Sequence, residues 1–111
     1  MSGRNMRPIP GYAFDTSLLN ALLYKAINPQ GIPYPCALLR IVNESVADIT
    51  LSYDGVVAHD FIKSGAARDL SGSNGLNEIG ITAAWKKGTK IYVKGAPIKG
   101  AIYLIGYYLI D

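Results

Sequence analysis

An alternating segment at residues 46–53 reads Val-Ala-Asp-Ile-Thr-Leu-Ser-Tyr. Its apolar or aromatic side chains recur at every second position, at Ala47, Ile49, Leu51 and Tyr53. The positions between them carry polar side chains, at Asp48, Thr50 and Ser52. Because successive side chains of a strand point to opposite faces of its sheet, this pattern predicts a half-buried β-strand.

Turn signals bound this strand on both sides. The polar run at residues 43–45, Asn-Glu-Ser, predicts a turn before it. Asp54-Gly55 predicts a tight type I′ hairpin after it, because that turn needs positive φ at both central positions. The return strand is then expected at residues 56–62.

Further strands are predicted on the same grounds at residues 37–42, 76–85, 90–94 and 101–110. Between residues 15 and 28, leucines at helical spacing compete with the proline-rich connection that follows, and we favour extended structure. Turn signals recur about every 8–12 residues, which is typical of a sandwich or a barrel. The sequence therefore predicts an all-β protein.

The N-terminal segment differs from the rest of the chain in composition. Residues 1–11 contain two Arg, two Pro, two Gly and no acid, which predicts an extended arm. We divide the chain into an arm at 1–13 and a β-sandwich domain at 14–111, and expect the domain to fold without residues 1–11. Arg4, Arg7 and Tyr12 are then candidate contacts to a partner, and a disordered terminus is the alternative.

Composition limits the possible classes of protein. The 111 residues are 50% hydrophobic and 17% charged, with a net charge of +3, which fits one globular domain. Cys36 is the sole cysteine, so no internal disulfide is expected. Apolar runs are too short for a signal peptide or a membrane-spanning helix, so we expect a soluble protein made in the cytoplasm, with no membrane partner.

Catalytic motifs are missing from the sequence. His59, close to Asp54 and Asp60, resembles a base oriented by a carboxylate, but no nucleophile motif accompanies it. A histidine that is hydrogen-bonded within its own loop explains the pattern more simply. With one His and one Cys in the chain, we expect no enzyme activity, no metal and no cofactor.

A basic stretch leaves two readings open. It contains Lys86, Lys87, Lys90, Lys94 and Lys99. Lysines on turns and strand edges protect sheets against edge-to-edge aggregation, which is the interpretation that we favour. The alternative is a nucleic-acid or polysaccharide binding module, although no specific nucleic acid is indicated.

The terminal segment at residues 101–110 is apolar on both of its predicted faces. Such a strand must be covered on both sides, by the rest of the fold or by another chain. Tyrosine is a common anchor of protein interfaces, and Tyr103 and Tyr107 share one face. We therefore expect self-association, most simply as a two-fold dimer, with these two residues near the contact.

The order of these segments resembles a known group of virion proteins. Residues 39–55, His59-Asp60-Phe61-Ile62, residues 88–95 and Gly106-Tyr107-Tyr108 carry the likeness, together with the length and the arm. They resemble the capsid decoration proteins, also called cement or staple proteins, of short-tailed bacteriophages such as Salmonella phage epsilon15.

This resemblance implies a jelly-roll-like antiparallel β-sandwich on the outer surface of the virion. The implied function is to bind the major capsid protein and staple neighbouring subunits, so that the shell is stabilised, and the family has no active-site residues to transfer. Similar modules occur as tail, collar or fibre components, which is the alternative virion function.

Overall fold

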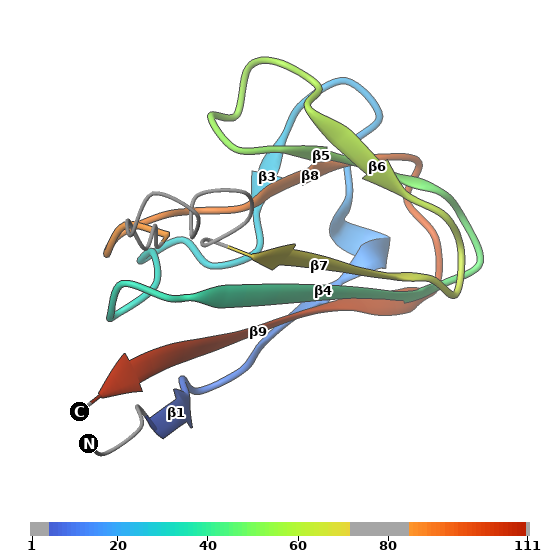
Figure 1. Cartoon of the computed structure of the whole chain (residues 1–111). Coiled ribbons are helices and arrows are strands. Elements are labelled where there is room, and N and C mark those ends of the chain that lie inside the picture. The colour runs from blue at the N-terminus through green and yellow to red at the C-terminus, as the bar shows by residue number, and fades with distance from the viewer. Residues whose placement is uncertain (1–4, 72–84, 111) are drawn as a thin grey trace.

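Two antiparallel sheets lie face to face in a computed structural model that describes residues 5–71 and 85–110 (Figure 1). The chain alternates between them, so that each sheet is assembled from strands distant in sequence. This confirms the predicted all-β fold and the antiparallel sandwich. The jelly-roll-like connection stays a prediction.

The first sheet has five strands in the order β1-β9-β4-β7, with β2 also paired to β9. Their bounds are Asn5–Pro8 for β1, Tyr12–Asp15 for β2, Leu38–Ser45 for β4, Ala67–Ser71 for β7 and Gly100–Ile110 for β9. β9 is central because its residues 100–107 pair with β4 along one side, and its residues 101–104 and 107–110 pair with β2 and β1 along the other.

The second sheet has four shorter strands in the order β3-β8-β5-β6. Their bounds are Lys25–Ala26 for β3, Ile49–Ser52 for β5, Asp60–Ile62 for β6 and Tyr92–Lys94 for β8. A strand within residues 46–53 is confirmed as β5, where Ile49 and Leu51 are buried between the sheets and Thr50 is half-buried, but Ser52, predicted on the polar side, is buried as well.

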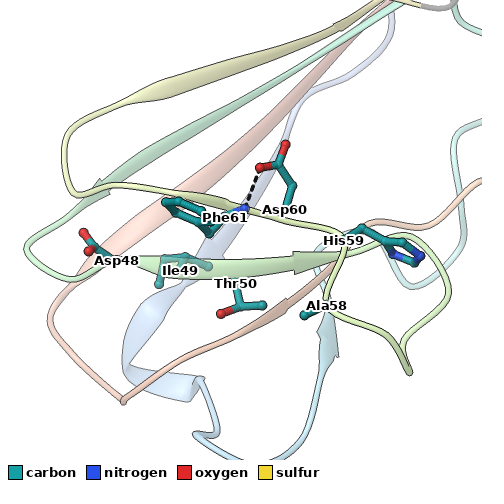
Figure 2. A pocket seen from close by; sticks show the side chains of 7 residues that line it. All are labelled: Asp48, Ile49, Thr50, Ala58, His59, Asp60 and Phe61. Carbon is teal, nitrogen blue, oxygen red and sulfur yellow. Dashed lines mark hydrogen bonds between the residues drawn. The ribbon is translucent and has the colours of Figure 1, made fainter.

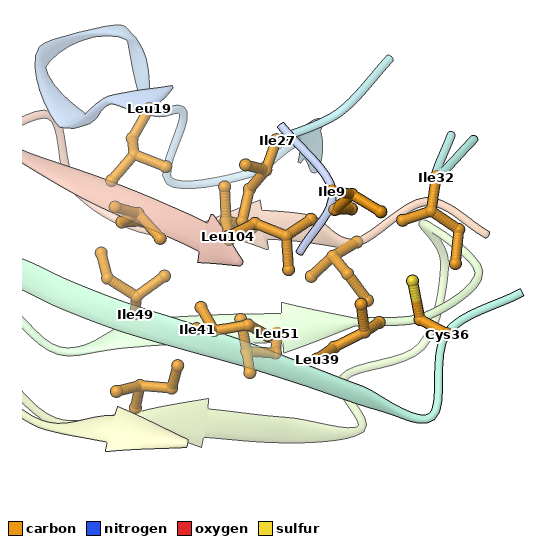
Figure 3. Close-up of a cluster of buried hydrophobic side chains, with 14 residues drawn as sticks. Ile9, Leu19, Ile27, Ile32, Cys36, Leu39, Ile41, Ile49, Leu51 and Leu104 are labelled. Carbon is orange, nitrogen blue, oxygen red and sulfur yellow. The ribbon is translucent and has the colours of Figure 1, made fainter. Parts of the chain in front are cut away.

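Buried aliphatic side chains fill the space between the sheets (Figure 3). Both sheets contribute, with Leu39 and Ile41 from β4 and Leu51 from β5. Ile9 also belongs to this core and is 4% exposed. Residues 5–8 pair with β9, so the described part of the predicted arm is an edge strand, and the boundary at residue 13 falls inside β2.

The turn predicted at Asn43-Glu44-Ser45 is wrong, because these residues continue β4 and pair with β9 as far as Gly100. The buried Asn43 side chain makes this possible. Its amide donates to the carbonyl oxygens of Ala47 and Ile62, and its oxygen accepts from Ser45. A buried amide with all these partners is compatible with a strand interior.

The type I′ hairpin predicted at Asp54-Gly55 is also wrong. Of the described residues, only glycines have positive φ, so Asp54 does not adopt the required conformation. Its carboxylate instead accepts from the backbone N–H groups of Val56 and Val57, which produces a wider loop. The return strand is therefore short and begins only at Asp60.

Residues 15–28 form neither a long helix nor one continuous strand. They contain the one-turn 3-10 helix η1, Thr16–Leu18, capped by the Asp15 carboxylate, and the two-residue strand β3. Of the strand predicted at 76–85, only Trp85 lies within the described residues, where it forms a bridge with Cys36. In the part of the chain that the structure describes, no helix is long and apolar enough to cross a membrane.

Candidate interaction surface

The two faces of β9 differ in exposure. Ile102 and Leu104 point into the core and are 0% exposed, as expected for one face of the strand. On the other face, Tyr103 is 36% exposed, and Ile105 and Tyr107 are half-buried. The outer face of β9 is therefore aromatic and aliphatic but is not part of the core.

Strand register extends this surface across β4. Residues directly paired across antiparallel strands share a face. Val42 is paired with Tyr103, and Leu38 with Tyr107, and both aliphatic side chains are half-buried. We call the outer surface formed by Leu38, Val42, Tyr103, Ile105 and Tyr107 the Tyr103 face.

An ion pair crosses the same side of the sheet. Arg40, which is paired with Ile105, donates through Nε and a terminal nitrogen to the two carboxylate oxygens of Asp69, at 2.6 and 3.0 Å. The hydrogen bond from Arg40 holds the pKa of the Asp69 carboxyl below its usual range. Because this geometry engages both oxygens, the charges lie in a fixed arrangement beside the apolar residues.

The other predicted interface residues do not join the Tyr103 face. Tyr12 is paired with Leu104, so it lies on the inner side, and its hydroxyl donates to the carbonyl oxygen of Gly31. Arg7 is exposed and is paired with Tyr108, whose ring stacks on that of Tyr34 with centroids 4.3 Å apart. Arg4 lies outside the described residues. The sequence did not indicate the Tyr34–Tyr108 stack, because it joins residues distant along the chain.

His59 is held by its own loop. Nδ1 accepts from the backbone N–H of Tyr53 at 3.0 Å, and the imidazole stacks on the Tyr53 ring. Nε2 lies 4.0 Å from an Asp54 oxygen. With Nδ1 engaged as an acceptor, the ring has a structural function in this loop. Across residues 5–71 and 85–110, no cluster of three His, Cys, Asp or Glu side chains is placed to hold a metal.

The lysines of the basic stretch do not gather into one patch. The turn at residues 86–90 lies at the end of the sandwich near the C-terminus, and the segment at 95–99 lies at the opposite end (Figure 1). Lys94 lies between them on β8, where its ammonium group is 4.6 Å from the centroid of the Tyr24 ring. A nucleic-acid strand would need a continuous basic groove, so this distribution does not favour it.

Comparisons with known proteins give distant structural similarity only. No protein-family model and no curated protein matches the chain. One similar solved structure is that of Bacillus endospore appendages, described as a novel family of disulfide-linked pili. It has 9% sequence identity and a TM-score of 0.47, over 97% of this chain and 89% of that chain. Another is the crystal structure of PirA, with 12% identity and a TM-score of 0.40, over 97% of this chain and 95% of that chain.

Proposed function

We propose that this protein is a structural virion component that binds the outer surface of a phage capsid and staples neighbouring major capsid subunits. It would be made in the host cytoplasm and act on the assembled shell. The proposal rests on the sequence resemblance described above and, as the main structural support, on the Tyr103 face. This surface combines one exposed tyrosine and several half-buried apolar side chains with a hydrogen-bonded backbone.

The backbone under the Tyr103 face is held on both sides. β9 is hydrogen-bonded to β4 on one side and to β1 and β2 on the other, so the face is ordered before any partner binds. Binding by such a preorganised surface loses less conformational entropy than binding by a flexible loop. Each square ångström of apolar surface removed from water contributes roughly 25 cal/mol to the free energy of binding. Repetition of the contact over a closed shell multiplies this effect.

A sheet edge is a less suitable contact than this face. At β6, the Arg68 guanidinium donates to the carbonyl oxygen of Phe61, and the Asp60 carboxylate accepts from the Phe61 N–H. Arg68 and Asp60 are themselves paired at 3.2 Å. Charged groups that satisfy the outward backbone atoms prevent the addition of another strand. The second sheet is thus protected at this edge, and contact through side chains is favoured.

Co-sedimentation tests the proposal directly. Tagged chain is added to expanded heads of the phage that encodes it, and the bound fraction is measured after centrifugation, together with the temperature at which the heads release DNA. We expect saturable binding and a higher release temperature. Tyr103→Ser combined with Tyr107→Ser should reduce occupancy. Tyr34→Ser, which changes an exposed tyrosine outside the Tyr103 face, is the matched control.

Two alternatives predict other results. A tail, collar or fibre component would sediment with those parts and leave the release temperature of the heads unchanged. A nucleic-acid module would bind DNA with an affinity that falls steeply as salt rises, whereas contact through apolar groups depends weakly on salt. A folded chain that binds no part of the virion would disprove the proposal.

A further inference from the structure

The outer side of the four-stranded sheet carries a row of unlike side chains. Thr50 is paired with Phe61 of β6 on one side and with Lys94 of β8 on the other. Cross-strand partners share a face, so Lys94, Thr50 and Phe61 follow one another across the sheet. This row begins with a cation and ends with an aromatic ring that is 54% exposed.

A pocket opens at the Phe61 end of the row (Figure 2). Its volume is about 380 Å³, and Asp48, Thr50, Ala58 and Phe61 are among its lining residues. Asp48 is exposed, and one of its oxygens accepts from the Ser64 N–H. Among the described residues, no cation forms an ion pair with Asp48. The pocket thus offers apolar walls and a carboxylate to a cationic group with an aliphatic stem.

Lys94 is such a group, and it lies on the same face of the same sheet. Its ammonium is over the Tyr24 ring, and within the described part of the chain it has no carboxylate partner. The surface is therefore bipolar, with Lys94 on one side of Thr50 and the Asp48 pocket on the other. Rotation by 180° about an axis over Thr50 and parallel to β5 would place Lys94 of one copy opposite the pocket of another.

Two loops of the same construction flank this row. The Asn20 side-chain oxygen accepts from the N–H groups of Leu22 and Leu23, as the Asp54 carboxylate does from those of Val56 and Val57. Each loop is thereby fixed and presents two exposed aliphatic side chains. Leu22 is 84% exposed and Val56 is 79% exposed. Both loops project from the four-stranded sheet on the side away from the five-stranded sheet (Figure 1).

We propose that this surface binds the same surface of a second copy around a two-fold axis, with Lys94 of each copy entering the Asp48 pocket of the other. Charge complementarity favours a second copy of the chain as the partner, because an isologous contact needs a surface that matches itself after rotation. The fixed aliphatic loops add apolar area at the rim of the contact. The Tyr103 face lies on the opposite side of the sandwich and remains free for a different partner.

Charge reversal in two separate variants tests this arrangement. Sedimentation equilibrium of the full chain should show a dimer, and Lys94→Glu or Asp48→Lys should each raise its dissociation constant at least about tenfold. In a 1:1 mixture of the two variants, both contacts of the heterodimer are attractive again. The mixture should therefore dimerise nearly as well as the wild type. Such a rescue cannot come from a folding defect, and circular dichroism of each variant verifies its fold.

A third variant tests whether the contact lies on the outer side of the four-stranded sheet. Tyr103→Ser combined with Tyr107→Ser should leave this dimer unchanged, whereas it would disrupt the dimer through Tyr103 and Tyr107 that the sequence alone predicted. The proposal is overturned by a wild type that stays monomeric at high concentration or by folded single variants that dimerise normally. It is equally overturned by a mixture that shows no recovery, or by loss of the dimer in the Tyr103/Tyr107 variant.

Discussion

The side chain of Ile9 lies directly over Gly106, so close that a Cβ atom at position 106 would fall 2.8 Å from Ile9 Cδ1. Leu39 Cδ2 would lie 3.0 Å from the same atom. Ile9 also donates its backbone N–H to the Gly106 carbonyl oxygen at 2.9 Å. The N-terminal segment is thus fixed to the middle of β9 by one hydrogen bond and one close contact.

This contact predicts that Gly106 does not tolerate a side chain. Gly106→Ala should lower the free energy of unfolding by about 1–3 kcal/mol, because Ile9 and Leu39 must leave their packed positions. Gly11→Ala is the control, since the nearest atom to its added Cβ is 3.9 Å away. Urea unfolding measures both. Equal stability of the two variants would show that the core yields to the extra methyl group without cost.

Deletion of residues 1–11 should destabilise the domain, although the sequence alone predicts that the domain folds without them. The deletion removes buried Ile9 and leaves one side of β9 without β1. Loss of one buried isoleucine costs at least about 2 kcal/mol. Deletion of residues 1–4, which retains β1 and Ile9, is the control. Thermal unfolding at a single pH compares the two truncated chains, and an unchanged midpoint after the longer deletion would contradict the contribution of Ile9.

The loop at residues 54–57 should lose stability only in strong acid. Hydrogen bonds from the Val57 and Val56 N–H groups lower the pKa of Asp54 from 3.8 to about 2. A lowered carboxyl pKa stabilises the folded state above the unfolded value, and this contribution disappears as the pH falls from about 4 through 2. A carboxyl-carbon NMR titration should therefore have its midpoint near 2.

A matched variant isolates the charge of Asp54 from its hydrogen bonds. Asp54→Asn keeps an oxygen acceptor, as Asn20 does in the other loop, but it does not titrate. The amide shifts of Val56 and Val57 should then be independent of pH between about 4 and 2. If the Asp54 carboxyl of the wild type titrates with a midpoint at the ordinary carboxyl value, the hydrogen bonds to Val56 and Val57 do not lower its pKa.

Removal of the Tyr24 hydroxyl should not weaken the fold. This buried oxygen has no hydrogen-bond partner among the described residues. Tyr24→Phe is therefore expected to be neutral or stabilising, because no bond is lost and no desolvated hydroxyl remains. Tyr12→Phe is the comparison, since it removes the bond to the Gly31 carbonyl oxygen at a cost of about 1 kcal/mol. Chemical denaturation measures the stability of both variants. The proposed function does not depend on either result.

The sequence by itself determined the fold class, one strand of the second sheet and the longest strand of the first. The alternation at residues 46–53 is local, and a period of two assigns it to a strand whatever else the chain does. The apolar run at 101–110 likewise predicts a strand that needs cover on both sides, and β9 at Gly100–Ile110 confirms that strand. That Tyr103 and Tyr107 share a face also follows from their spacing.

Only the tertiary structure decided which strands pair and which side chains meet. Asn43 is a turn-forming residue by local preference, but partners at Ala47 and Ile62 keep it inside a strand. Tyr12 differs from Tyr103 because register with Leu104 turns it toward the other side of the sheet. These outcomes depend on contacts between segments far apart in the chain, and the free energy of such contacts outweighs local turn preference.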